Sequence, residues 1–167
     1  MSDYYWTAVY TKSRAEKKIA QRLSVMNIEH YLPMQKTRVQ WSDRMKTVEK
    51  VIIPGYIFVY VSEREYYDVL NVNGCVTYVR HDGKAARIRE SQMNSMKLIL
   101  CDQPDACISE NTFGAGQMVE INSGSFKGFV GEVVYQKNSG RLLVRIDQIG
   151  LCISLEVPMA QLQATNV

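Results

Sequence analysis

The chain has 167 residues, a mass of 19.1 kDa, 46% apolar residues and a formal charge of +3. This size and composition suit one or two small globular domains and exclude a disordered tail as the main content. No run approaches the roughly 18 apolar residues that a membrane-spanning helix needs, and residues 1–5 lack the cationic and apolar parts of a signal peptide. We therefore expect a cytoplasmic protein with no membrane partner.

The net charge is divided unevenly along the chain. Residues 1–104 hold 16 Lys and Arg against 11 Asp and Glu, whereas residues 105–167 hold 4 against 6. Ten of the basic residues lie between Tyr10 and Lys50. Such a patch attracts polyanions and can contact phosphates, although a solvated charged face has the same composition.

The first predicted elements are a strand and a helix. Alternation over Tyr4–Tyr10 predicts the strand. Ser13 and Glu16 have the spacing of a capping box, which predicts a helix that begins there and ends near Met26. Apolar residues at helical spacing predict its buried face: Ala15, Ile19, Ala20, Leu23 and Met26. Basic residues spaced by four predict a stripe on another face: Arg14, Lys18 and Arg22.

The next segments lead to the most informative strand. Residues 28–33 predict a short strand, and residues 34–50 are polar and basic with little periodicity, which predicts a loop or a flexible hairpin. Alternation over residues 51–61 then puts aliphatic residues on one face: Ile57, Val59 and Val61. The opposite face carries aromatic residues in line: Tyr56, Phe58 and Tyr60. Because rings are costly to leave in water, they are covered either by this chain or by a partner.

Further short elements complete the first half. Ser62 and Glu65 form a second capping box before a short helix that ends at Leu70. Turn signals at residues 73–74 and 82–83 bound strands over residues 75–80 and 85–88, and apolar spacing predicts a helix over residues 91–101. Helices interleaved with an antiparallel sheet of about four strands predict an α+β sandwich over residues 1–103.

The composition changes after Asp102. Polar residues dominate residues 104–113, which predicts a linker. From Gly114 onward, turns that contain glycine separate short runs of β type: residues 117–121, 131–136, 142–146 and 151–157. Several short strands with such turns predict a small β-barrel over residues 114–167.

Catalytic and metal-binding motifs are absent from the sequence. The cysteines form no Cys-x-x-Cys pair, and we expect all four to be reduced packing residues: Cys75, Cys101, Cys107 and Cys152. Only His30 and His81 could join them in a metal site. No nucleophile elbow, phosphate loop or complete dinucleotide motif occurs, so we expect neither an enzyme nor a cofactor.

Three segments together resemble the NusG family of transcription elongation factors. Residues 6–16 are similar to the first strand and helix start of the family, and residues 54–59, Pro-Gly-Tyr-Ile-Phe-Val, are similar to its central strand motif. Residues 116–133 are similar to the KOW motif, which ribosomal proteins also carry. The resemblance implies a NusG N-terminal domain followed by a small SH3-like KOW barrel.

The resemblance also implies partners and contact residues. The family binds RNA polymerase with a hydrophobic face that grips the clamp helices of the largest subunit, bridges to the second-largest subunit across the cleft and disfavours pausing. The matching aromatic positions are Tyr10, Tyr56 and Phe58. Family members that act at particular operons also read the nontemplate DNA strand of the paused bubble. The matching basic positions are Lys12, Arg14, Lys18 and Arg22, and the segment with Arg38, Arg44 and Lys46 could extend them.

Two segments depart from the general NusG pattern. Residues 122–126 read Asn-Ser-Gly-Ser-Phe where general NusG proteins usually have Asp-Gly-Pro-Phe, and residues 150–158 lack the Gly-Arg-x-Thr-Pro core. The chain is more similar to specialised paralogues, such as the UpxY group that relieves termination in capsular polysaccharide operons. We expect a monomeric antitermination factor of this kind. The alternatives are a housekeeping factor that couples polymerase to Rho or the ribosome, and a KOW module that binds RNA or the ribosome, which the acidic second half disfavours.

Overall fold

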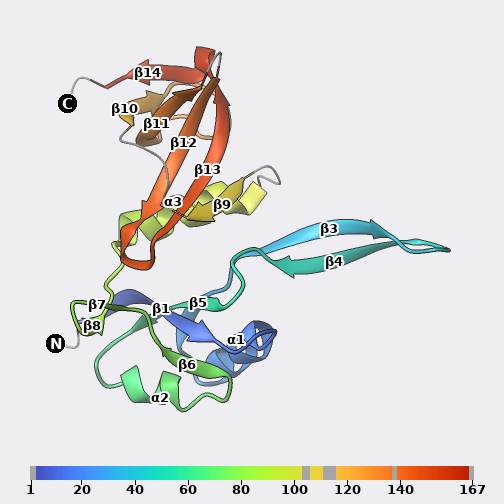
Figure 1. Cartoon of the computed structure of the whole chain (residues 1–167), viewed down its shortest axis with the longest axis vertical. Helices are drawn as coiled ribbons and strands as arrows, with labels where there is room; N and C mark the ends of the chain where they lie inside the picture. Colours follow the sequence, from blue (N-terminus) through green and yellow to red (C-terminus); the bar gives the residue numbers. More distant parts are fainter. Residues whose placement is uncertain (1–2, 103–105, 111–115, 137–138, 166–167) are drawn as a thin grey trace. The chain divides into compact units, whose positions relative to one another are not determined.

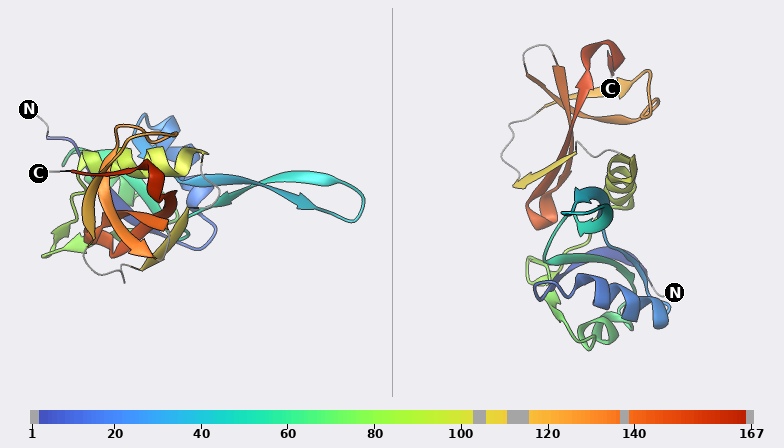
Figure 2. Two further views of the ribbon diagram at one scale, coloured as in Figure 1. Left: turned by 90° about the horizontal axis from the view of Figure 1, so that it is seen from above. Right: turned by 90° about the vertical axis from the view of Figure 1, so that its right-hand side faces the viewer.

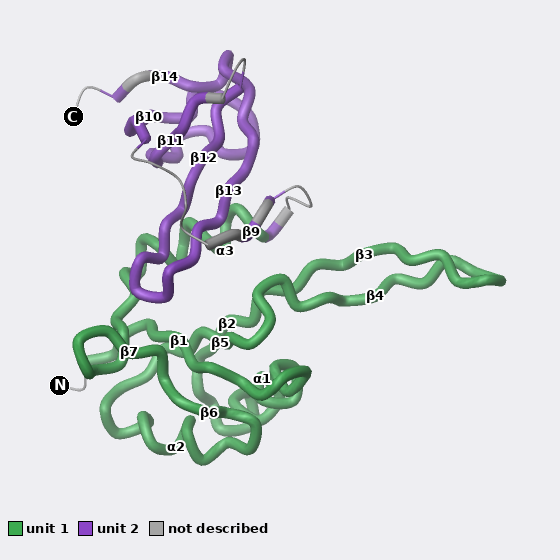
Figure 3. The backbone as a smooth tube through the Cα atoms, in the orientation of Figure 1, with its two compact units in different colours: residues 1–100 green, residues 101–167 purple. Residues whose placement is uncertain are grey.

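The computed structural model describes residues 3–102, 106–110, 116–136 and 139–165. The chain forms two compact units, residues 1–100 and residues 101–167, which are coloured separately in Figure 3. Each unit has its own main sheet, with four strands in unit 1 and six in unit 2. None of the described helices is long and apolar enough to cross a membrane.

Unit 1 is built on an antiparallel sheet with the strand order β2-β5-β1-β6, whose four strands are labelled in Figure 3. The strands of this sheet are β1 (Tyr5–Thr11), β2 (Glu29–Tyr31), β5 (Tyr56–Val61) and β6 (Cys75–Tyr78). The helices are α1 (Glu16–Val25), α2 (Tyr66–Leu70) and α3 (Glu90–Asp102), whose last residues cross the unit boundary. Two short ribbons are separate from the sheet: β3 (Met34–Gln40) with β4 (Met45–Val51), and β7 (Arg80–His81) with β8 (Lys84–Ala85). The predicted α+β class is confirmed.

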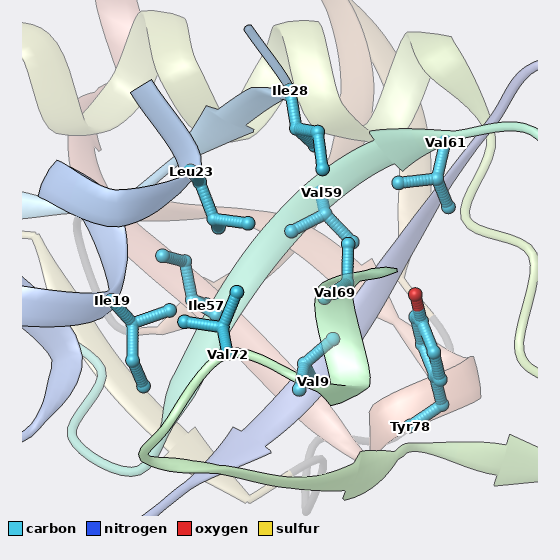
Figure 4. Close-up of a cluster of buried hydrophobic side chains, with 10 residues drawn as sticks. All are labelled: Val9, Ile19, Leu23, Ile28, Ile57, Val59, Val61, Val69, Val72 and Tyr78. Atoms are coloured by element: carbon cyan, nitrogen blue, oxygen red, sulfur yellow. The ribbon is translucent and has the colours of Figure 1, made fainter. Parts of the chain in front are cut away.

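Alternation along β1 and β5 gives the sheet an aliphatic face and an aromatic face. Val9 lies opposite Ile57, and Ala8 lies opposite Phe58. The aliphatic face packs with α1 and α2 in the buried cluster of Figure 4: Val9, Ile19, Leu23, Ile28, Ile57, Val59, Val61, Val69, Val72 and Tyr78. Removing such side chains from water stabilises the fold by about 25 cal/mol per Å² of apolar surface. The predicted burial of the aliphatic residues of β5 is therefore confirmed.

The start of α1 differs from the prediction. The helix begins at Glu16, and no side chain caps its end, so the capping box predicted at Ser13 is wrong. Arg14 precedes the helix in a left-handed conformation with φ of 62°. The Glu16 carboxylate accepts a hydrogen bond from the distant Gly55 amide instead, at 2.9 Å. Met26 lies beyond the helix and is 42% exposed, so it is not part of the predicted buried face.

The second capping box forms in part. The Glu65 carboxylate accepts hydrogen bonds from the main-chain amide of Ser62 at 3.0 Å and from the Ser62 hydroxyl at 2.9 Å. The α2 helix begins at the next residue, Tyr66. The Ser62 hydroxyl therefore donates to the carboxylate and does not accept from the main chain as a full capping box requires.

Residues 34–51 form a hairpin, which was one of the two structures predicted for this segment. Strands β3 and β4 pair in seven antiparallel positions, from Met34 opposite Val51 to Gln40 opposite Met45. Trp41 and Arg44 close the turn by exchanging main-chain hydrogen bonds at 2.9 and 3.3 Å. The views of Figures 1 and 2 agree that this ribbon projects from the rest of unit 1.

Unit 2 is a β-rich unit with one antiparallel sheet in the order β14-β10-β11-β12-β13-β9. Its strands are β9 (Cys107–Glu110), β10 (Gln117–Ile121), β11 (Val130–Gln136), β12 (Ser139–Ile146), β13 (Leu151–Pro158) and β14 (Leu162–Ala164). Strand β9 lies inside the segment predicted as a linker and pairs with β13, so that prediction is wrong at these residues. Residues 104–105 and 111–113 of the same segment lie outside the described residues. Strands β14 and β9 stand at opposite ends of the order, so closure into the predicted barrel is not seen in the described residues.

Candidate functional site

Aromatic side chains gather on the face of the unit 1 sheet opposite the buried cluster. This aromatic face is made by Tyr4, Trp6, Tyr10, Tyr31, Tyr56, Phe58 and Tyr60. Ring pairs cross the sheet, and the centroid distances are 5.3 Å between Trp6 and Tyr60 and 4.9 Å between Tyr10 and Tyr56. Tilted ring pairs at such distances are favourable beyond their area burial.

Helix α3 lies over part of the aromatic face. The Lys97 ammonium is 4.3 Å from the centroid of the Trp6 ring and 5.6 Å from that of Tyr31. A cation placed over a tryptophan ring is attracted by the negative ring face. Trp6 is only 4% exposed. The middle of the aromatic face is therefore internal packing.

The three predicted aromatic contacts have different positions on this face. Tyr10 is 38% exposed, and its ring neighbour Tyr56 is partly exposed. Burial, together with the neighbouring Tyr10 hydroxyl, raises the pKa of Tyr56 to about 12. Phe58 is fully buried, with 0% exposed, so this ring has no surface to offer a partner. The aromatic face is therefore exposed at both ends, at the adjacent Tyr10–Tyr56 pair and at Tyr4, which is 44% exposed.

The predicted basic residues do not form one stripe. Lys18 and Arg22 are exposed and one turn apart on α1. The Arg22 guanidinium donates a hydrogen bond to the Asn73 carbonyl at 2.8 Å. Lys12 and Arg14 are also exposed, but they lie in the turn before the helix, where Arg14 has a positive φ. The stripe was predicted from helical spacing, which does not apply to a residue outside the helix.

The basic residues also line two different pockets. A pocket of about 530 Å³ lies between α1 and the end of α2 and is lined by Gln21, Arg22, Val25, Met26, Asn71 and Asn73 among others. A second, of about 500 Å³, lies where α1 begins and the β3–β4 ribbon ends, and Arg14, Lys17 and Lys50 line it. The Lys17 ammonium donates a hydrogen bond to the Glu49 carbonyl at 2.8 Å and so ties the ribbon to α1. Arg14 and Arg22 therefore lie on different surfaces of unit 1.

Sequence reasoning missed several basic and aromatic residues of the same unit. Lys17 and Lys50 were not predicted as a group with Arg14, although the structure brings them to one pocket. Trp41 is 59% exposed at the tip of the ribbon, and the Lys46 ammonium lies 5.8 Å from its ring centroid. A sequence signal was present, because polar Ser42-Asp43 separates two runs with alternating charged residues.

Unit 2 contains a partly buried charged pair, Glu132 of the KOW-like segment and Arg145. Arg145 donates two hydrogen bonds to the Glu132 carboxylate, at 2.8 and 2.9 Å, and the Gly116 amide donates a third at 2.7 Å. The Arg145 guanidinium first, and the Gly116 amide second, hold the pKa of Glu132 below its usual value. This pair joins β11 to β12 and to the chain entering β10, so its role is structural.

Thiols and metal ligands are dispersed. Cys75, Cys101 and Cys152 are free cysteines, of which Cys152 is buried and Cys101 is exposed, so the packing prediction is wrong for Cys101. The side chain of Cys107 lies outside the described residues. In the part of the chain that the structure describes, no three His, Cys, Asp or Glu residues come together as a metal site.

Comparisons with known proteins agree with this architecture. The family model "Transcription termination factor nusG" matches residues 4–97, which is more than half of the chain. A NusG transcription termination/antitermination protein of Chlamydia pneumoniae is 26% identical over 161 residues, covering 88% of this chain and 87% of the relative. That of Staphylococcus aureus strain N315 is 25% identical and covers 95% of this chain and 94% of the relative.

A solved structure described as "Domain interaction in Thermotoga maritima NusG" has a TM-score of 0.52 at 18% identity. It covers 98% of both chains and shows the same fold. The α+β unit followed by a β-rich unit is thus the fold that the chain shares with this structure. With the family model matched across the sheet and the helices of unit 1, the chain belongs to the NusG family of transcription termination and antitermination proteins.

Proposed function

We propose that this protein binds RNA polymerase through the Tyr10–Tyr56 end of the aromatic face and suppresses pausing and termination in the cytoplasm. The observation that supports this assignment is the pair of adjacent rings, 4.9 Å apart, that keep exposed surface while Phe58 beside them is buried. Interface hot spots are enriched in tyrosine, and one such ring contributes on the order of 2 kcal/mol. Two adjacent rings suffice for an anchor on an apolar groove between helices.

The partner surface that fits is the clamp-helix region of the largest polymerase subunit. A protein held there and also touching the second-largest subunit would bridge the cleft and disfavour the opening that accompanies pausing. Phe58 has a supporting role in this proposal, because its buried ring fixes the strand that carries Tyr56. No cofactor and no catalytic step is involved.

Binding to core polymerase tests the interface. We expect the Tyr10→Ala, Tyr56→Ala double variant to bind core enzyme about 10- to 100-fold more weakly, since each tenfold step is about 1.4 kcal/mol. Tyr67→Ala is the matched control, because Tyr67 on α2 is 70% exposed and lies away from the aromatic face. If the folded double variant binds core polymerase as tightly as the wild type, the proposed interface is wrong.

The nontemplate strand of the bubble is the second proposed partner. Lys12, Arg14, Lys18 and Arg22 are exposed around the start and outer side of α1, and phosphate contacts there would make binding salt-sensitive. Sequence choice would need base contacts as well. The divided arrangement of the four residues suggests two separate contacts along the strand, one at Lys12 and Arg14 and one at Lys18 and Arg22.

We assign the protein to the specialised antitermination factors that act at particular operons, such as those for polysaccharide biosynthesis. The altered turn at residues 122–126 and the altered segment 150–158 support this choice over a housekeeping role with Rho or a ribosomal protein. Transcription with purified polymerase on templates that differ only in nontemplate bubble sequence separates the two. A specialised factor increases readthrough on some of these templates, whereas a uniform response on all of them supports the housekeeping role.

A further inference from the structure

The β3–β4 ribbon is exposed along almost its whole length. Every residue from Met34 to Lys50 is exposed except Gln35, which is partly exposed. Its seven ladder pairs, at about 3.3 Å per residue, make an arm roughly 23 Å long. An isolated two-stranded ribbon has no core of its own and is marginal in water. An arm of this length therefore calls for an explanation other than internal stability.

The ribbon carries a charge excess equal to that of the whole protein. Its cations are Lys36, Arg38, Arg44, Lys46 and Lys50, against two carboxylates, Asp43 and Glu49. Among the described residues, no ion pair forms between any of these five cations and a carboxylate. Lys36 and Arg38, opposite Glu49 and Thr47, share one face of the ribbon, whereas Lys46 and Lys50, opposite Val39 and Gln35, lie on the other. A polyanion could thus be contacted on both sides at once.

Apolar side chains accompany the cations on one face. Val39 pairs with Lys46 and Thr37 pairs with Val48, which places both valines on the same side of the ribbon. Val39 is 40% and Val48 is 38% exposed, and Trp41 follows at the tip with Lys46 over its ring. Methyl groups next to cations suit the floor of a nucleic-acid groove, where they meet thymine methyl groups and base edges.

We propose that the β3–β4 ribbon inserts into the major groove of duplex DNA. The major groove of B-form DNA is about 12 Å wide and admits a two-stranded β-ribbon, whereas the deep and narrow groove of A-form RNA does not. The valine face then meets the bases, Lys46 and Lys50 on that same face reach the phosphates at the groove walls, and Lys36 and Arg38 on the opposite face add to the positive potential that attracts the duplex. This goes beyond the proposed contact with the single nontemplate strand, and it does not depend on polymerase binding.

Fluorescence anisotropy with the full chain tests the proposal in the absence of polymerase. The probes are a labelled DNA duplex of about two helical turns, its single strand and an RNA duplex of equal length. We expect the DNA duplex to bind more tightly than either other probe. The triple variant Arg38→Gln, Arg44→Gln, Lys46→Gln should bind the duplex at least about tenfold more weakly, with the slope of log K against log salt smaller by about 2 to 3.

A charge-matched triple variant distinguishes DNA binding by the ribbon from a general effect of the net positive charge. Arg64→Gln, Arg80→Gln, Lys84→Gln removes the same charge from exposed positions of unit 1 outside the ribbon. We expect its duplex affinity to fall less than about threefold. Equal losses in the two triple variants would overturn the proposal, as would a single strand or RNA duplex bound as tightly as the DNA duplex.

Trp41 gives a second measurement that needs no charge change. Because Trp6 is buried and Trp41 is exposed, added duplex DNA should quench mainly the Trp41 emission. The Trp41→Phe variant should fold as the wild type and lose this quenching. Quenching that persists in Trp41→Phe would place the DNA away from the ribbon and overturn the proposal. Polymerase binding by the same variant reports separately on the proposed function.

Discussion

The Glu16 carboxylate, in the first turn of α1, accepts a hydrogen bond at 2.9 Å from the main-chain amide of Gly55, directly before β5. Glu16 is 5% exposed, although glutamate is rarely buried. The Gly55 carbonyl in turn accepts from the Thr11 amide at 2.9 Å. Gly55, whose φ of 85° suits glycine, is thus held on both sides. This contact positions Tyr56, the next residue, beside Tyr10.

Glu16→Ala should lower the free energy of unfolding by about 2 kcal/mol, because it leaves the Gly55 amide without its acceptor. Glu16→Gln keeps an acceptor oxygen and should cost about half as much. Urea denaturation measures both. Glu29→Ala, at an exposed position of β2, is the control and should change stability by less than about 0.5 kcal/mol. Equal effects at Glu16 and Glu29 would mean that the carboxylate is not a structural anchor.

Phe58→Ala and Tyr10→Ala should differ in stability, because Phe58 packs in the interior whereas Tyr10 is proposed to contact a partner. Phe58 is fully buried, so its truncation should cost about 3–5 kcal/mol of unfolding free energy. Tyr10 is 38% exposed, so its truncation should cost about 1 kcal/mol and leave the fold intact. Thermal denaturation followed by circular dichroism measures the difference. Similar costs for the two variants would contradict the assignment of Phe58 to the interior.

Glu132→Gln should destabilise unit 2 by about 1–3 kcal/mol near neutral pH, because it removes the charge-assisted bonds from Arg145. The folded state lowers the pKa of Glu132. Its contribution is therefore fully present above the unfolded-state pKa, near 4.3, and is lost as pH falls through the lower folded-state pKa. The wild type and Glu132→Gln should therefore become more alike in stability as the solution is acidified.

Urea denaturation at a series of acidic pH values tests that convergence. Glu120→Gln is the control, since Glu120 on β10 is exposed. The gap between the wild type and this control should be small at every pH. A constant gap for Glu132→Gln across the acid range would show that the ion pair adds nothing to folding.

The cysteines should differ in reactivity according to burial. Burial raises the pKa of the Cys75 thiol to about 11 and also raises the pKa of Cys152. Because the thiolate is the nucleophile, iodoacetamide should modify exposed Cys101 first near pH 8 and leave Cys75 and Cys152 largely unmodified. Peptide mass spectrometry over time measures each site. Cys75 modification should accelerate as pH rises toward about 11, and modification of Cys75 as fast as Cys101 at pH 8 would contradict its placement.

Local patterns predicted the elements whose partners are close in sequence. The period of two in β5 identified its two faces, because successive side chains of a strand point to opposite sides whatever lies around them. The turn at Asp82-Gly83 is likewise a local property, and both residues have the positive φ that such a hairpin turn needs. The NusG resemblance rests on segments of this kind.

Contacts between residues distant in sequence decided the features that local patterns predicted wrongly. Ser13 and Glu16 have the spacing of a capping box, yet the Glu16 carboxylate accepts its hydrogen bond from the Gly55 amide, 39 residues away. A rule based on local spacing cannot predict a partner so distant in sequence. Strand β9 lies in a segment that is predicted to be a linker because polar residues dominate the segment as a whole, while its pairing with β13 depends on a partner far along the chain.

The sequence by itself determined that a row of aromatic rings lies on one face of a sheet, since that follows from strand geometry alone. Only the tertiary structure decided which of those rings remain in contact with water. Lys97 of α3 lies over Trp6 and Tyr31, and Phe58 is fully buried, whereas Tyr10 and Tyr56 keep exposed surface. Burial depends on what packs above a face, and a period of two carries no information about that layer.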